Sequence, residues 1–206
     1  MGVKHHKKML DILTLEELRT VVTESESLIP TRHQSMLTSI LDLERISVDD
    51  IMIPRAEVIG IDLNDDEAEI LAKIRNMQHT LIPIYKDNID DIYGIFHMRN
   101  LVGCFTGQKF CKQQLMQLSE KPYFVPEGTP LHTQLFNFQH NRYRMGLVVD
   151  EYGDILGLVT LADILEEIVG EFTTDITATN RIIPQSDHSF LVDGGTNIRT
   201  LNQSMQ

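Results

Sequence analysis

The sequence has only two cysteines, and no metal-binding or catalytic motif accompanies them. Cys104 and Cys111 have neither a CxxC spacing nor a nearby pair of histidines. A structural zinc site needs four ligands, so we expect no metal site and two ordinary thiols in a reduced compartment. The chain also lacks a P-loop, a nucleophile elbow and the Ser-His-Asp order of a hydrolase triad. We therefore expect no catalytic residue and no enzyme activity.

Basic residues are scarce as well. Eighteen lysines and arginines stand against thirty acidic residues, which gives a net charge of −12. Binding to a nucleic acid backbone requires a cationic face, so this balance argues against a nucleic acid partner. It does not exclude one small anionic ligand, because a local cradle of amides and hydroxyls is enough to hold a phosphate.

Long hydrophobic runs are also missing. No apolar stretch of the sequence approaches the roughly 18 residues that cross a bilayer. The basic start at residues 1–8 precedes a polar helix, so it is not a signal peptide. It is either a cloning remnant or a basic segment that follows a membrane helix. We expect the fragment itself to be soluble.

The most informative feature that is present is an internal repeat. Gly94 in IYGIF aligns with Gly157 in ILGLV, an offset of 157 − 94 = 63 residues. At the same offset Ile84 aligns with Leu147, and the alignment runs without a gap back to Ile61 and Phe124. This many aligned apolar and turn positions indicate a duplication.

Each repeat predicts the same order of elements: an extended segment, an amphipathic helix, two strands and a closing helix. In the first repeat these are residues 58–61, 66–77, 81–85, 92–96 and 98–105. In the second they are residues 123–125, 130–140, 145–149, 155–159 and 161–169. Such a unit is too small to bury its sheet alone, so two should pack as a pair in an α/β (α+β) fold. Two short helices, after a capping box at Thr14 and after Pro30, form an N-terminal hook.

One strand-to-helix turn has the composition of an anion site. Thr160 stands at a predicted helix N-cap after a buried strand, and Asp163 follows three residues later. The Thr hydroxyl and the first-turn amides suit a phosphate, and the Asp carboxylate suits the two hydroxyls of a ribose. The same spacing is that of a plain capping box, which is the commoner case. Spacing alone favours the cap.

These residues resemble a known family. Residues 157–163 look like the G-h-h-[ST]-x-x-D signature of CBS domains. Together with VDDIMIPR, YFVPE, VDEYG and LVTLADILEEIVG, the set is similar to the CorB/CorC group of magnesium and cobalt efflux proteins, relatives of the animal cyclin M transporters. The resemblance covers most of residues 14–175 and is closest to the CorB branch. It implies tandem CBS repeats, a Bateman module, packed as a pseudo-twofold pair.

The resemblance also implies a division of the chain. Residues 1–46 form the helical segment that follows a membrane domain in the family, 47–106 the first CBS repeat and 107–172 the second. Residues 173–206 are a linker and the truncated start of a transporter-associated domain, in which we expect a strand and a helix start between 189 and 201.

The ligand that the resemblance implies is AMP or ATP, with Mg²⁺ if it is ATP. The expected contacts are Thr160, Asp163, Ile53, Pro54, Met145 and Gly157. In the family, Thr often stands at position 53 and Arg at position 81, where this chain has Ile and Leu. Arg55 and Arg144 are candidate substitutes for the second. His97 and Asn100 occupy the positions of Thr160 and Asp163 in the first repeat, so we expect that half-site to be degenerate.

The implied function is a regulatory module that senses an adenine nucleotide, forms a homodimer and gates a magnesium/cobalt efflux-type transporter. Its expected place is the cytoplasmic face of the inner membrane, next to its own transmembrane domain. One alternative is a ligand-free dimerisation scaffold, and another is a nucleotide hydrolase, which lacks an assembled base or metal triad. The adjacent carboxylates Glu166, Glu167 and Glu171 fit a solvated helix face better than a cation site.

Overall fold

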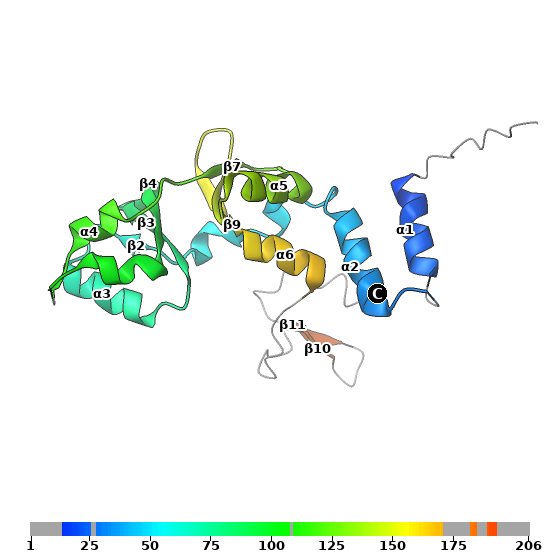
Figure 1. Cartoon of the computed structure of the whole chain (residues 1–206), viewed down its shortest axis with the longest axis horizontal. Helices are drawn as coiled ribbons and strands as arrows, with labels where there is room; N and C mark the ends of the chain where they lie inside the picture. Colours follow the sequence, from blue (N-terminus) through cyan, green and yellow to red (C-terminus); the bar gives the residue numbers. More distant parts are fainter. Residues whose placement is uncertain (1–13, 26–27, 108, 171–181, 185–188, 193–206) are drawn as a thin grey trace, which may run out of the picture.

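The computed structural model describes residues 14–25, 28–107, 109–170, 182–184 and 189–192. The basic start of the chain lies outside them. Two sheets with their helices make up the body of the molecule, and two further helices lie at one end (Figure 1). Of the helices in the described ranges, none has the length and apolar character needed to cross a membrane.

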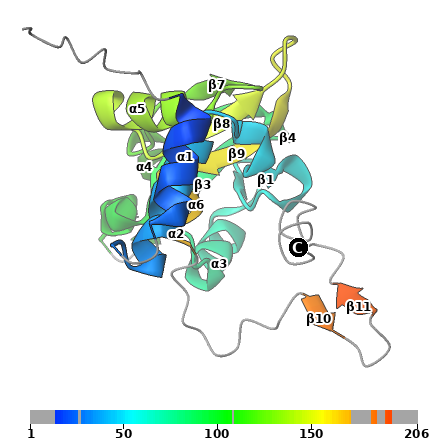
Figure 2. The same cartoon turned by 90° about the vertical axis from the view of Figure 1, so that its right-hand side faces the viewer.

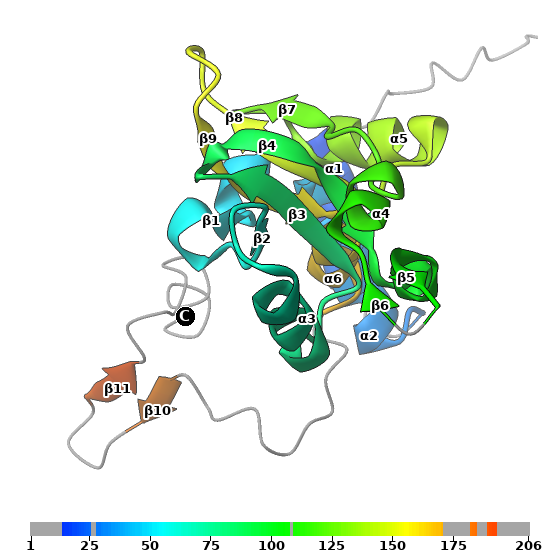
Figure 3. The same ribbon diagram turned by 90° about the vertical axis from the view of Figure 1, so that its left-hand side faces the viewer.

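The first repeat is a three-stranded sheet with strand order β2-β3-β4 (Figure 3). Strand β2 (Ile61–Asp62) runs parallel to β3 (Leu81–Lys86), which is antiparallel to β4 (Asn88–His97). Helix α3 (Glu67–Asn76) joins β2 to β3, and the Asp66 carboxylate caps it by accepting from the amides of Ala68 and Glu69. The predicted closing helix is present, as the 3-10 helix η3 (Met98–Cys104).

The second repeat has the same plan. Strand β7 (Phe124–Pro126) is parallel to β8 (Met145–Val149), which is antiparallel to β9 (Ile155–Thr160). Helix α5 (Leu131–Asn141) joins β7 to β8, and α6 (Leu161–Val169) closes the unit. Apolar side chains of both sheets meet between the repeats, among them Leu81, Ile95, Met145, Leu147 and Leu158. The predicted packing of two α/β repeats as a pair is therefore confirmed.

The two repeats exchange short segments, which the sequence did not predict. Strand β1 (Ile53–Pro54) precedes the sheet of the first repeat but pairs with β9 of the second, followed by the 3-10 turn η2 (Arg55–Glu57). In return, Glu120 precedes the sheet of the second repeat and pairs with Ile95 of the first. The segment before Glu120 contains the short strands β5 (Phe105–Thr106) and β6 (Lys109–Phe110) and helix α4 (Lys112–Gln117). The edge of each sheet is thus paired with the segment that comes just before the sheet of the other repeat.

The aligned glycines allow these exchanges. A Cβ on Gly157 would lie 2.3 Å from the carbonyl oxygen of Ile53, and a Cβ on Gly94 would lie 2.7 Å from that of Glu120. Any side chain at either position would push the exchanged segment away from its sheet. The glycine at the same place in both repeats is required by the same backbone contact.

The ungapped repeat alignment is wrong by one residue before the hairpins. Ile84 pairs with Gly94, and Val148 pairs with Gly157, so Ile84 is equivalent to Val148 and not to Leu147. The offset is 64 on β3 and β8 but 63 on β4 and β9, because the second hairpin is one residue shorter. Leu147 and Val148 are both fully buried. The hydrophobic pattern therefore cannot distinguish the two registers.

The N-terminal hook is an antiparallel helix pair (Figure 2). Helix α1 (Leu15–Glu24) starts at the predicted capping box of Thr14 and Glu17, and α2 (Thr31–Asp42) starts after Pro30. The guanidinium of Arg19 contacts Asp42 at 2.7 Å, and the buried Gln34 amide donates to the Val22 carbonyl. Helix α2 lies against α6. A 3-10 turn η1 (Val48–Asp50) then leads into β1.

Two short strands follow the second repeat. Strand β10 (Ile182–Pro184) pairs antiparallel with β11 (Phe190–Val192). The strand predicted after residue 189 is confirmed as β11, whereas β10 was not predicted. The helix start predicted after it lies outside the described residues.

Candidate functional site

A cavity of about 570 Å³ lies between the two repeats. This volume is typical of small-molecule sites. Its walls come from the segment after β1, the residues around the start of β3, the end of β4 and the start of α6. The apolar lining includes Ile53, Val58, Leu81, Met145, Leu158 and Leu161, and the polar lining includes Glu57, His79, Thr80, His97, Arg144, Thr160 and Asp163.

The start of α6 is built as the sequence predicted. Thr160 is the N-cap: its hydroxyl oxygen accepts from the Asp163 amide at 3.2 Å, and Asp163 Oδ2 accepts from the Thr160 amide at 2.7 Å. The capping box is therefore real, and the same two side chains line the cavity. In the described part of the chain, no hydrogen bond engages Asp163 Oδ1. Burial raises the pKa of Asp163, and the hydrogen bonds with Thr160 oppose this rise.

His97 ends β4 on the other repeat and also lines the cavity. Its Nδ1 accepts from the Arg99 amide at 3.2 Å, so the neutral ring carries its proton on Nε2. Burial lowers the pKa of His97, and the positive charges of Arg99 and Arg144 lower it further, while Glu120 acts in the opposite direction. The imidazole is thus held neutral as a hydrogen-bond donor.

Asn100, the first-repeat residue equivalent to Asp163, makes a different contact. The side-chain amide of Asn100 donates to the Leu118 carbonyl at 3.4 Å, and Asn100 is not among the residues that line the cavity. The Asn100 amide thus contacts the segment that precedes the sheet of the second repeat. The degeneracy of this half-site stays a prediction, and it agrees with this use of Asn100.

Four of the six predicted contacts come together in the cavity: Ile53, Met145, Thr160 and Asp163. Pro54 and Gly157 are not among the lining residues; they pair with each other between β1 and β9. Their role in the structure is to bring β1 against β9. The residues just before β3, Gln78, His79 and Thr80, line the cavity but were missed. The one sequence feature that could have indicated them is that they directly precede Leu81, a position where the family often has a ligand-contacting Arg.

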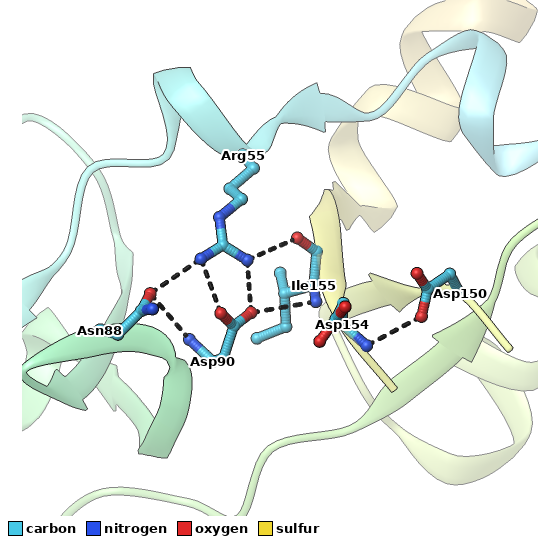
Figure 4. A network of polar contacts seen from close by, with 6 residues as sticks. All are labelled: Arg55, Asn88, Asp90, Asp150, Asp154 and Ile155. Carbon is cyan, nitrogen blue, oxygen red and sulfur yellow. Dashed lines mark hydrogen bonds and ion pairs between the residues drawn. The ribbon is translucent and has the colours of Figure 1, made fainter. Parts of the chain in front are cut away.

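The two candidate arginines have different places. Arg144 lines the cavity. Arg55 instead forms a network at the hairpin of the first repeat (Figure 4). Its guanidinium makes a bidentate ion pair with Asp90, and it also donates to the Asn88 side chain at 2.8 Å and to the Ile155 carbonyl at 3.1 Å.

The Arg55 network joins the repeats. Asp90 on β4 also accepts from the amide of Ile155 on β9 at 3.2 Å. The hydrogen bonds from Arg55 lower the pKa of Asp90, so the carboxylate is charged at neutral pH. We call this contact of Arg55, Asp90 and Ile155 the inter-repeat clamp. Sequence reasoning missed it, since no local pattern relates these three positions.

No metal centre is evident: across the described ranges, no group of three or more His, Cys, Asp or Glu side chains is placed to hold a metal ion.

Comparison with known proteins identifies this arrangement. Residues 115–170 match the CBS domain family. The UPF0053 inner membrane protein YfjD of Escherichia coli (strain K12) is 48% identical over 207 residues, which are 99% of this chain and 48% of that protein. The chain therefore spans about half the length of this relative.

Two solved structures are similar to the chain. A CBS-domain pair with bound AMP from Klebsiella pneumoniae is 50% identical, with a TM-score of 0.57 over 61% of this chain and 99% of that one. The CBS domain of the bacterial CNNM/CorC family Mg²⁺ transporter in complex with ATP is 34% identical, with a TM-score of 0.62 over 68% of this chain and 99% of that one. The chain belongs to the CBS-domain modules of the CNNM/CorC family, which is not a family of enzymes.

Proposed function

We propose that the cavity binds an adenine nucleotide, and that the module senses this ligand. The observation that carries the proposal is the meeting of Thr160 and Asp163 at the start of α6 with apolar side chains from both repeats in one cavity. Nucleotide sites commonly combine an apolar slot for the base with a helix N-terminus for the phosphate.

The lining residues fit such a ligand. Ile53, Val58 and Leu158 are apolar and suit the faces of a purine ring. Asp163 Oδ1 is an available acceptor for a ribose hydroxyl. Thr160 retains its hydroxyl proton for donation, and the first amides of α6 carry the positive end of the helix dipole, which favours a phosphate.

The related structures support AMP and ATP as candidates, since one holds AMP and the other ATP. Glu57 and Asp163 place two carboxylates on the cavity wall. Each added phosphate therefore meets more repulsion, and we expect ATP to bind with Mg²⁺, which reduces its charge.

We further propose that the module gates transport in a longer membrane protein. A ligand shifts an equilibrium only if it binds the two states unequally. The cavity walls come from both repeats, so its affinity for a ligand depends on their relative position. The similarity to an inner membrane protein of about twice the length supports an attachment to a membrane domain. We propose that the module lies at the cytoplasmic face of that membrane, as a homodimer next to a domain for magnesium and cobalt efflux.

Isothermal titration of AMP, ADP and ATP, with and without Mg²⁺, tests the nucleotide proposal. We expect one site per chain. Asp163→Asn should weaken binding about tenfold or more, because the amide retains the cap contact with Thr160 but loses the charged acceptor. Glu17→Gln is the matched control, since it makes the same change in the capping box of α1, far from the cavity. Absence of heat with every nucleotide in a folded sample would refute the proposal.

A ligand-free dimerisation scaffold is the second candidate. It is favoured by the capping box, in which Thr160 and Asp163 engage each other without any ligand, and by the apolar residues Ile53 and Leu81. Analytical ultracentrifugation separates the two functions. A dimer with no binding and no response to nucleotide supports the scaffold, whereas saturable binding excludes it.

A further inference from the structure

Arg144 is the single lysine or arginine among the residues that line the cavity. Its side chain is exposed, and within the described ranges no hydrogen bond or ion pair engages its guanidinium. The neighbouring arginines differ: Arg55 is bound in the inter-repeat clamp, and Arg99 approaches Glu120 at 3.8 Å. Arg144 therefore has a full set of donors that the fold leaves unused.

The backbone holds Arg144 beside the start of α6. The amide of Leu161, the first residue of α6, donates to the Arg144 carbonyl at 3.0 Å, and the next residue, Met145, pairs with Thr160. Arg144 thus lines the cavity next to the N-cap of α6. Its charge also reaches His97 on the other repeat, since it lowers the pKa of that imidazole.

This end of the cavity combines three features from both repeats that favour an anion: a guanidinium, the Thr160 hydroxyl at the positive end of the α6 dipole, and the Nε2 proton of His97. Against them stand the carboxylates of Glu57 and Asp163. Without Arg144, the charged side chains that line the cavity would all be negative. A phosphate monoester carries between one and two negative charges at pH 7, and Arg is the side chain best shaped to pair with it.

We propose that Arg144 is the phosphate-binding cation of the cavity, and that it makes the site selective for a nucleoside phosphate over the uncharged nucleoside. This rests on the proposed nucleotide function of the same cavity. The Thr160 hydroxyl and the positive end of the α6 dipole also favour the phosphate, and the apolar walls and Asp163 hold the nucleoside, which does not require Arg144.

Paired titrations of AMP and adenosine into the full chain test this. Arg144→Leu should weaken AMP by about 10- to 30-fold, the loss of a charge-assisted bidentate contact at an exposed site, and leave adenosine within about twofold. Arg144→Lys should retain part of the AMP affinity. Raising the salt concentration should reduce the AMP affinity of the wild type and have a smaller effect on Arg144→Leu.

Arg142→Asn is the matched control. Arg142 caps the C-terminus of α5 with a left-handed φ of 59°, a conformation that Asn tolerates, and it is not among the cavity-lining residues. This variant loses the same unit of charge two residues away. We expect its AMP affinity to stay within about twofold of the wild type.

The outcomes separate the two proposals. If the wild type binds AMP and Arg144→Leu binds it equally well, the role of Arg144 is wrong while the nucleotide function stands. If Arg144→Leu loses AMP and adenosine in equal measure, the side chain shapes the cavity and does not read the phosphate, which also overturns the inference. If the wild type binds neither ligand, the proposed function fails and the inference fails with it.

Discussion

Replacing Gly157 by alanine should damage both the fold and the cavity. The new Cβ would lie 2.3 Å from the Ile53 carbonyl oxygen and 3.1 Å from the sulfur of Met52. An ordinary contact begins near 3.4 Å, so β1 must retreat by about 3.4 − 2.3 = 1.1 Å. The obstacle is backbone, so no side-chain rotation relieves it. The β1–β9 pairing and the position of Ile53 in the cavity should be lost together.

The magnitude follows from these contacts. Overpacking typically costs 1–3 kcal/mol, and each backbone hydrogen bond lost between β1 and β9 costs about 1 kcal/mol. We expect Gly157→Ala to lower the free energy of unfolding by about 3 kcal/mol, which is roughly 6–12 °C in Tm for a chain of this size. Displacement of Ile53 removes part of one apolar wall, so AMP affinity should also fall about tenfold.

Gly94→Ala is the control that the repeat itself provides. Its Cβ would lie 2.7 Å from the Glu120 carbonyl oxygen, so the displacement is smaller, about 3.4 − 2.7 = 0.7 Å. Glu120 is not among the lining residues of the cavity. Thermal unfolding and AMP titration should therefore show a loss of stability in both variants and a loss of affinity only in Gly157→Ala. If Gly157→Ala melts and binds like the wild type, the close approach of β1 does not constrain the fold.

Two further predictions concern the clamp and the thiols. Arg55→Leu should lower the free energy of unfolding by about 1 kcal/mol at pH 7, a value discounted for the partial exposure of the pair. Because Arg55 lowers the pKa of Asp90, this contribution is complete above the unfolded-state pKa of about 3.9 and is lost as the pH falls through the lower folded-state value. Urea titrations should thus show a difference between the two proteins that shrinks below about pH 4, and a difference independent of pH would contradict the role of Asp90. Burial raises the pKa of the Cys104 thiol to about 11, so iodoacetamide at pH 8 should alkylate the less buried Cys111 first. Peptide mass spectrometry reports the order, and faster labelling of Cys104 in the native protein would show that its surroundings are open.

The elements with strong local signals were predicted well. Strand β8 was predicted at residues 145–149 and is observed as Met145–Val149. It is a continuous apolar run between turn residues, which is typical of a buried strand. The N-cap of α6 was predicted for a similar reason, since Thr160 and Asp163 stand at capping-box spacing directly after such a strand. Local chemistry determines both features.

The exchanged edges could not be predicted from local patterns. Strand β1 has two residues, too few for any periodicity, and its partner Leu158 lies more than a hundred positions along the chain. Gly94 and Gly157 were recognised as equivalent from the sequence. Each is required because a backbone carbonyl of the exchanged segment approaches it closely, and the sequence does not show where that segment lies. The same limit applies to the cavity. The sequence offered Arg55 and Arg144 equally as the cation of the cavity. Only the structure distinguishes them, because the path of η2 directs Arg55 to Asp90 and leaves Arg144 on the cavity wall.

That path also explains why the cavity and the relative position of the repeats are connected. The segment from Ile53 to Ile59 supplies one wall of the cavity, with Ile53 at one end and Val58 near the other. Arg55, between them, holds Asp90 of the first repeat and Ile155 of the second. Five consecutive peptide bonds join Ile53 to Val58, so we expect a ligand that moves this wall to move Arg55 as well. The coupling that the proposed sensor requires is therefore expected to run through this one short segment.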